Sequence, residues 1–225
     1  MGQNVSFPSN GHTTNGYVAA PAFRKGPGVV VIQEWWGLVP HIEDVAERFS
    51  KEGFVACAPD LYHGKKATAP DEAGRLLMEL DADRAEKDIA GAGNYVLARP
   101  ECTSKTFGVV GFCMGGALAQ YAATKNPKVG AAVSFYGGFK KVHLDWEKLS
   151  APVLLIYGEK DEGVPASQAK MLEETLKKMG KSVETVVYPG AGHAFFRDTD
   201  PKVYKKDAAD DAWKRTLALF RATLK

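Results

Sequence analysis

Cysteine is scarce in this sequence, and its scarcity excludes a fold held together by disulfides. The 225 residues include only three cysteines, an odd number without CxxC spacing, in a chain long enough to build its own core. We therefore expect reduced thiols. The sequence also lacks a basic segment followed by an apolar one near its start, and no apolar run is long enough to span a bilayer. These absences predict a cytoplasmic protein.

An excess of charge of either sign is missing as well. The 29 Lys and Arg residues nearly balance 27 Asp and Glu residues, so nothing in the composition favours nucleic acid or a membrane as a partner. The hydrophobic share of 45% is typical of a globular protein, and no Pro-, Gly- or Ser-rich linker divides the chain. We expect one domain over residues 1–225, a small-molecule partner, and a monomer or weak homodimer.

Short apolar runs alternate with helix-length segments along most of the chain. The predicted strands are Gly28–Gln33, Phe54–Ala58, Thr106–Val110, Val129–Phe135, Val153–Tyr157 and Val183–Tyr188. The predicted helices are Ile42–Glu52, a region from about Asp71 to Leu97, Met114–Thr124, Ala166–Met179 and Asp207–Leu224. This alternation predicts an α/β fold with a mainly parallel, doubly wound sheet. Before it, Gly2–Phe7 and Gly16–Ala20 are expected to pair through a turn at Ser9-Asn10-Gly11.

The most informative motif is Gly-x-Cys-x-Gly, formed by Gly111, Cys113 and Gly115 between a predicted strand and a predicted helix. Small residues two places before and after a nucleophile allow the tight, strained corner of a nucleophile elbow. A thiol at a helix N-terminus is also favoured as the thiolate. The alternatives are a buried structural cysteine, which is our interpretation of Cys57 and Cys102, and a dinucleotide-binding loop, whose G-x-G-x-x-G spacing is absent.

A nucleophile elbow requires an acid and a histidine later in the chain, each on a loop after a strand. Asp161 follows the predicted strand that ends at Tyr157, and His193 follows the one that ends at Tyr188. Either residue alone could be structural, as a helix-capping acid or a core histidine. The three positions together, in this order, predict a catalytic triad of Cys113, Asp161 and His193.

The remaining histidines give no sign of a metal site. His12, His41, His63 and His143 are dispersed and lack a ligand spacing such as H-E-x-x-H. His63 lies in a basic turn that could border the site, but a solvated turn is the interpretation we adopt. The sequence predicts neither a metal nor another cofactor.

Five motifs carry a resemblance that covers nearly the whole chain. They are Gln33-Glu34-Trp35-Trp36-Gly37, Ala58-Pro59-Asp60-Leu61-Tyr62, Gly111-Phe112-Cys113-Met114-Gly115-Gly116, Gly158-Glu159-Lys160-Asp161, and Gly192-His193-Ala194-Phe195 followed by Arg197. With cysteine at the elbow, the chain resembles the dienelactone hydrolase (carboxymethylenebutenolidase) family of the α/β-hydrolase fold. The resemblance implies hydrolysis of an ester or lactone.

The resemblance also implies roles for residues around the triad. Glu34 would face Cys113 and hold the thiol proton while the site is empty, although it could instead cap the loop before the next helix. The backbone N–H groups of Trp35 and Met114 would stabilise the oxyanion. A broader carboxylesterase or thioesterase would use the same residues, whereas a thiol-sensing protein would bind or be oxidised at Cys113 without turnover.

The predicted substrate contacts are Arg197, Trp36 and Tyr136. In this family, two arginines hold the free carboxylate of dienelactone, and Arg197 matches the first. At the position of the second the sequence has Pro70, with Arg75 only nearby, so the resemblance does not specify dienelactone as the substrate.

Overall fold

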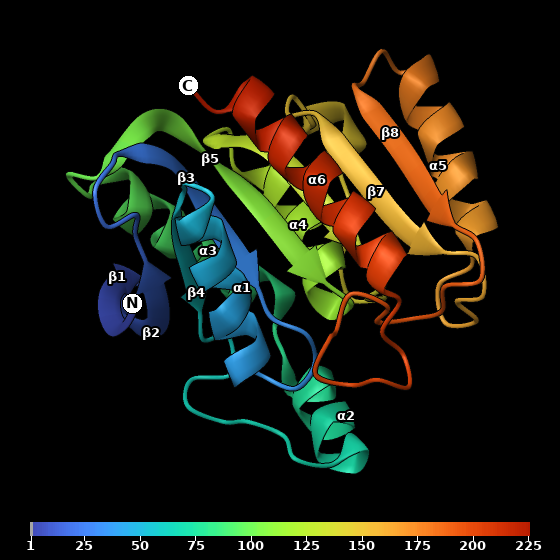
Figure 1. Cartoon of the computed structure of the whole chain (residues 1–225), viewed down its shortest axis with the longest axis horizontal. Coiled ribbons are helices and arrows are strands. Elements are labelled where there is room, and N and C mark those ends of the chain that lie inside the picture. The colour runs from blue at the N-terminus through green and yellow to red at the C-terminus, as the bar shows by residue number, and fades with distance from the viewer. Residues whose placement is uncertain (1) are drawn as a thin grey trace.

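The computed structural model describes residues 2–225, which fold around one eight-stranded sheet (Figure 1). The strand order is β1-β2-β4-β3-β5-β6-β7-β8, with β1 and β2 antiparallel to their neighbours and β3 to β8 parallel. The strands are β1 (Gln3–Ser9), β2 (His12–Ala19), β3 (Gly26–Ile32), β4 (Val55–Pro59), β5 (Cys102–Phe112), β6 (Val129–Phe135), β7 (Val153–Gly158) and β8 (Val183–Tyr188). The expected mainly parallel α/β fold is confirmed.

Helices cover both faces of the sheet. They are α1 (Pro40–Lys51), α2 (Pro70–Glu79), α3 (Ala82–Leu97), α4 (Met114–Lys125), α5 (Ala166–Lys178) and α6 (Lys206–Thr223), with a 3-10 turn at Trp146–Lys148. Phe49 of α1 and Phe220 of α6 share a core on the face toward the viewer in Figure 1. Ile89 of α3, Leu118 of α4 and Leu176 of α5 belong to the core on the opposite face. The sheet is therefore the middle of three layers.

The central strands are apolar throughout because both of their faces are buried. In β3, Val29 and Val31 point into the core beneath α1 and α6, whereas Val30 and Ile32 point into the other. All four side chains are fully buried. A parallel strand covered on both sides needs apolar residues at every position, and β3, which ends just before Gln33, has this pattern.

The N-terminal hairpin forms as expected but is longer than predicted. Its second strand begins at His12 instead of Gly16, because Asn10 and Gly11 both take positive φ values, 47° and 75°, and close a two-residue turn. Ser9 and His12 are consequently the first pair of the ladder.

The region from about Asp71 to Leu97, predicted as helical, forms two helices, α2 and α3. Leu80 leaves the helical conformation, with φ −62° and ψ 125°. The Asp81 side chain then accepts a hydrogen bond of 2.9 Å from the backbone N–H of Arg84 and begins α3. An N-terminal capping residue in the middle of an apolar pattern restarts the helix in a new direction.

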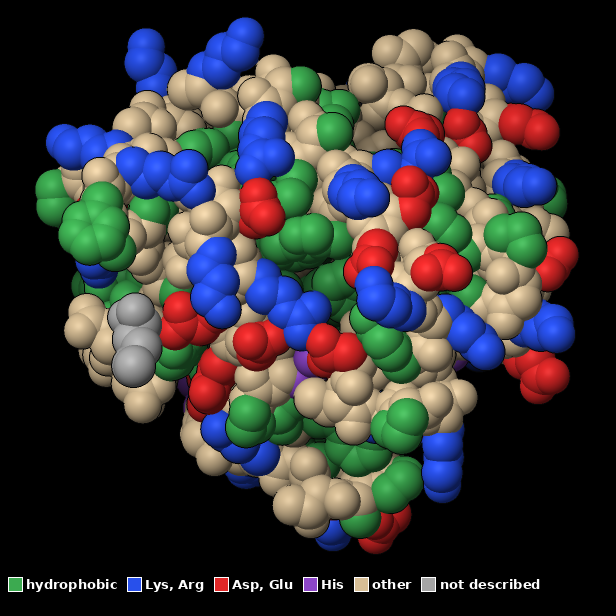
Figure 2. Space-filling model, in the orientation of Figure 1, with side chains coloured by type: hydrophobic (Ala, Val, Ile, Leu, Met, Phe, Trp, Pro, Cys, Tyr) green, Lys and Arg blue, Asp and Glu red, His purple; other side chains and the backbone are tan. Residues whose placement is uncertain are grey.

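Acidic and basic side chains are interspersed over the face shown in Figure 2. Within residues 2–225, none of the helices combines the length and hydropathy needed to cross a membrane.

Candidate active site

Cys113 lies between the end of β5 and the start of α4, with φ 54° and ψ −119°. A residue with a side chain is strained in this region and persists only where its surroundings enforce it. A Cβ on Gly111 would lie 1.9 Å from the carbonyl oxygen of Gly115, and one on Gly115 would lie 2.4 Å from that of Gln33. The Gly-x-Cys-x-Gly spacing is therefore required by the close approach of three backbone segments.

The structure brings the predicted acid and histidine together. Asp161 follows β7, His193 follows β8, and Nδ1 of His193 lies 2.7 Å from Oδ2 of Asp161. The other carboxylate oxygen accepts hydrogen bonds of 3.0 Å from the backbone N–H groups of Gly163 and Val164. The Asp161 carboxylate is fully buried and fixed by the backbone, so its remaining oxygen is aimed at the imidazole.

Hydrogen bonds also join the loops that carry these two residues. The N–H of Glu159 donates to the carbonyl of Tyr188 over 3.0 Å, and that of Lys160 donates to Ala191 over 2.8 Å. Gly158 allows the contact, because a Cβ there would lie 2.4 Å from the Ala191 oxygen. The loops that carry Asp161 and His193 are consequently held against each other by backbone hydrogen bonds.

The electrostatic environment favours the protonated form of His193. Burial disfavours the imidazolium, but interactions with Asp161 and with the sulfur of Cys113 outweigh it and raise the pKa of His193 to about 10. Cys113 is close enough to contribute to this shift, which brings the three predicted triad residues into one cluster. The arrangement can hold a proton on the imidazole beside a nucleophilic sulfur.

Glu34 lies at the carboxyl end of β3 and is 2% exposed. Burial raises the pKa of its carboxyl, an effect that the positive charges of Arg197 and His193 partly offset. Within residues 2–225, no hydrogen bond joins Glu34 to Cys113, and its Oε2 atom has no hydrogen-bond partner. The predicted contact of Glu34 with the thiol is therefore not formed here, and the thiol-gating role of Glu34 stays a prediction.

Tyr136 is fully buried beside this carboxyl. Its ring centroid lies 4.9 Å from that of His193, and its hydroxyl also lacks a hydrogen-bond partner among the described residues. Burial raises its pKa well above the usual value, and the charge of Glu34 adds to this effect. The Tyr136 side chain has no exposed surface that a substrate could contact. It lies beside Glu34 and His193, and its predicted contact with a substrate is not seen in this structure.

The two predicted oxyanion donors lie at neighbouring turns. Trp35 is inside a turn closed by a 3.3 Å hydrogen bond from Gly37 to Glu34, and Met114 is the first residue of α4. Neither N–H has an acceptor among the hydrogen bonds of the described chain. Because Gly115 packs against the backbone just before Trp35, these two free donors belong to adjacent segments.

Arg197 lies across the face of Trp36, with its guanidinium carbon 5.4 Å from the ring centroid. Its Nη2 atom donates to Asp200 over 2.8 Å, and both side chains are partly exposed. The guanidinium of Arg197 is thus held by Asp200 at one nitrogen, and its other N–H groups remain as hydrogen-bond donors. Pro70 begins α2, and Arg75, the nearby arginine, is exposed on that helix.

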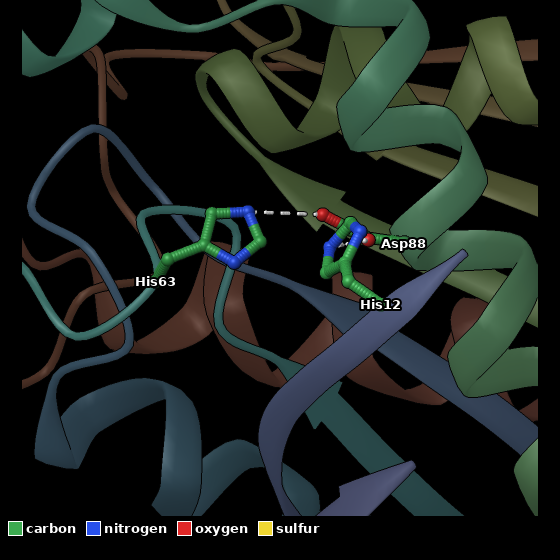
Figure 3. Close-up of side chains that lie close together, drawn as sticks. All are labelled: His12, His63 and Asp88. Carbon is green, nitrogen blue, oxygen red and sulfur yellow. Dashed lines mark ion pairs between the residues drawn. The ribbon is translucent and has the colours of Figure 1, made fainter. Parts of the chain in front are cut away.

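The structure gathers two histidines that the sequence leaves dispersed. His12 of β2 and His63 of the loop after β4 flank the buried Asp88 of α3, and all three side chains point toward one another (Figure 3). They come from segments far apart in the chain, so no spacing motif could indicate them. This cluster, and not a site beside Cys113, is where the described residues could hold a metal ion.

The fold and the placement of the nucleophile elbow at the carboxyl edge of the sheet define an α/β-hydrolase-fold enzyme. A sequence model of the dienelactone hydrolase family matches residues 14–224. Protein usf of Aquifex pyrophilus is 41% identical over 231 residues, covering 100% of both chains. A protein of Aquifex aeolicus named "Putative carboxymethylenebutenolidase" is 36% identical over 232 residues, with the same coverage.

Solved structures agree with these relatives. One described as a "Putative Dienelactone Hydrolase" from Klebsiella pneumoniae superposes with a TM-score of 0.89, at 30% identity and with 98% of each chain covered. The chain therefore belongs to the dienelactone hydrolase family, and it is a hydrolase that acts on esters.

Proposed function

We propose that this enzyme opens a lactone or cleaves a carboxylic ester through a thioester acyl-enzyme formed on Cys113, with His193 and Asp161 completing the triad. The observation that carries the proposal is the 2.7 Å contact between His193 and Asp161 beside a cysteine held in a nucleophile-elbow conformation. A nucleophile, a base and a group that orients the base are the parts that covalent acyl transfer requires.

In the first half of the reaction the sulfur of Cys113 attacks the substrate carbonyl, and the thiol proton resides on His193. The tetrahedral intermediate collapses with loss of the alkoxide, which takes the proton from His193, and a thioester remains. In a lactone this alcohol stays attached to the acyl group. In the second half, water gives a proton to His193 and attacks the thioester, and the carboxylic acid leaves as the sulfur is released.

The surrounding residues support both half-reactions. The N–H groups of Trp35 and Met114 donate to the oxyanion, and loss of one such donor typically costs about a hundredfold or more in rate. Glu34 keeps the thiol protonated while the site is empty and releases it when substrate binds. Burial raises the pKa of its carboxyl, which suits a group that takes up and releases a proton.

Arg197 is the group we assign to a carboxylate on the substrate. Asp200 occupies one of its nitrogens, and the Trp36 ring supports the guanidinium plane, so the remaining donors can form charge-assisted hydrogen bonds. With Pro70 in place of a second arginine, we assign the enzyme to lactones and esters as a class, without specifying dienelactone.

Cys113→Ala tests this proposal. The substitution fits the corner and removes the nucleophile, so the folded variant should lose turnover of p-nitrophenyl esters and lactones. Cys57→Ala and Cys102→Ala are the matched controls and should retain it. Native rates in a folded Cys113→Ala protein would refute the mechanism. If the native protein hydrolysed none of these substrates but oxidised reversibly at Cys113, a thiol sensor would replace the proposal.

A further inference from the structure

Asp88 of α3 is a fully buried acid placed between two partly exposed histidines, His12 and His63. One oxygen of its carboxylate accepts hydrogen bonds from the hydroxyls of Ser9 and Thr14. The other, Oδ2, has no hydrogen-bond partner. A buried carboxylate with one unsatisfied oxygen requires a nearby positive charge, because an uncompensated buried charge is strongly unfavourable.

Both imidazoles approach this carboxylate without forming hydrogen bonds to it. Nε2 of His12 lies 3.4 Å from Oδ1, and Nε2 of His63 lies 3.1 Å from Oδ2. Neither pair is hydrogen-bonded in the part of the chain that the structure describes, and Oδ2 of Asp88 has no hydrogen-bond partner there. Two zinc ligands with bonds of about 2.0–2.2 Å at tetrahedral angles lie about 3.3–3.6 Å apart. The two observed separations, each measured to a different oxygen of Asp88, are close to that range.

The protonation of His12 also suits a ligand. Its Nδ1 atom lies 3.2 Å from the carbonyl oxygen of Asn10, which can only accept a hydrogen bond, so Nδ1 carries the proton. In the neutral ring, Nε2 then presents a lone pair toward Asp88. The nearby hydroxyl of Thr14 cannot donate to that lone pair, because it donates to Asp88 over 2.9 Å. Histidine ligands of metals are commonly fixed by such a bond to a carbonyl.

The backbone holds His63 in place. Its φ of 51° is in the left-handed region, and both oxygens of Asp60 accept backbone N–H bonds from the residues on either side, Tyr62 at 3.1 Å and Gly64 at 2.6 Å. The ring is thereby directed at Asp88, as Figure 3 shows.

We propose that His12, His63 and Asp88 bind a divalent cation of the zinc type at a structural site separate from the active centre. The three candidate ligand atoms lie within 4.8 Å of one another. Two imidazoles and one carboxylate suit zinc, and water completes four-coordination from the solvent side, where His12 and His63 are 33% and 29% exposed. The alternative is a pair of ion pairs with protonated histidines.

A cation at this position would join the hairpin, the loop after β4 and α3. That loop also contains Tyr62, whose hydroxyl lies 3.5 Å from the sulfur of Met114 at the start of α4. The site would therefore fix a loop that contacts the residue following the nucleophile.

The test is thermal unfolding and titration calorimetry of the metal-free protein with ZnCl2. One equivalent should bind, and the Tm should rise by about 5–10 °C at a free zinc concentration of about a hundred times Kd. Loss of a residue that only hydrogen-bonds to a metal ligand raises the Kd for the metal roughly 10- to 100-fold. Because His12→Gln and His63→Asn each remove a ligand itself, each should raise the Kd for zinc by more than this. Asparagine tolerates the left-handed φ at position 63, so this variant should fold.

Two further variants separate this site from adventitious binding. His143→Ala removes an exposed histidine outside the cluster, and Cys113→Ala removes the thiol that could bind zinc in the active centre; both should bind zinc like the native chain. Absence of binding up to about 1 mM zinc, a concentration at which even weak association is measurable, would overturn the proposal. So would binding that survives in His12→Gln and His63→Asn, or that disappears in Cys113→Ala. None of these outcomes depends on ester hydrolysis.

Discussion

Replacing Asp161 by Asn tests the electrostatics of the triad with little change in shape. The side-chain oxygen of asparagine can still accept from Gly163 and Val164, the two backbone bonds that fix the native carboxylate. Its NH2 group then faces Nδ1 of His193, where a carboxylate oxygen at 2.7 Å accepts the imidazole proton in the native enzyme. The substitution therefore removes one charge-assisted hydrogen bond and favours the wrong tautomer of His193.

The expected loss follows from that bond. A hydrogen bond to a charged group contributes about 1.5–3 kcal/mol, which corresponds to roughly a 10- to 150-fold decrease in kcat/KM. The pKa of His193 should fall from about 10, because burial is then opposed by Cys113 and no longer by the charge of Asp161. The imidazolium is consequently lost at lower pH, and the alkaline limb of the pH profile should move down.

The same group links activity to stability. Because its pKa is about 10 in the folded protein and about 6.5 in the unfolded chain, His193 stabilises the fold fully below pH 6.5, and this contribution disappears as the pH rises through 10. In Asp161→Asn, the decline of Tm over this range should be smaller than in the native protein.

The assay is hydrolysis of p-nitrophenyl acetate between pH 5 and 10.5, together with NMR titration of the His193 ring. Asp198→Asn is the matched control, because Asp198 forms ion pairs with Arg48 and His41 and, within the described residues, no hydrogen bond with Asp161 or His193. A kcat/KM within about twofold of native, well below the 10-fold minimum expected for the lost bond, would refute the role given to Asp161. An unchanged His193 pKa would refute its electrostatic basis.

Other substitutions test the parts around the triad. Glu34→Gln should lower turnover and make iodoacetamide labelling of Cys113 independent of a bound substrate analogue, whereas retention of substrate-dependent labelling would exclude a gate at Glu34. Arg197→Ala should reduce kcat/KM for a carboxylate-bearing lactone by at least about tenfold and spare a neutral ester, and equal losses on both would assign it a supporting role. Gly111→Ala, whose Cβ would meet a backbone oxygen at 1.9 Å, should cost about 3 kcal/mol or more in unfolding free energy, unlike Gly74→Ala, which meets nothing within 4 Å. Comparable Tm values for these two alanine variants would contradict the steric argument.

The parallel sheet and the elbow could be predicted because their signals are local. Apolar runs such as the one through Val29 and Val31 are required by burial on both faces, and the glycines around Cys113 are required by backbone contact at one corner. Asp161 and His193 could be placed because each follows a strand, and parallel strands end at the same edge of the sheet.

Other features depend on packing between distant segments, which a single sequence does not encode locally. His12, His63 and Asp88 meet only because the hairpin, a loop and α3 converge. The burial of Tyr136 behind the triad likewise follows from the layers around it. The break at Leu80 was not predicted, because the residues on both sides of it are helical and the second start depends on the single capping residue Asp81.

Hydrogen bonds between the loops after β7 and β8 set the acid and the histidine apart from the cysteine in the structure of the active centre. Asp161 and His193 lie on loops joined by these hydrogen bonds, whereas the sulfur of Cys113 belongs to the corner between β5 and α4. The contact between acid and histidine is therefore supported by hydrogen bonds between two neighbouring loops, whereas the gap between sulfur and imidazole depends on how β5 and α4 are positioned relative to those loops. Because the sulfur of Cys113 also helps to raise the pKa of His193, a substitution beneath α4 that displaces the sulfur should change the titration of His193 together with the rate of hydrolysis, whereas the contact between His193 and Asp161 should persist.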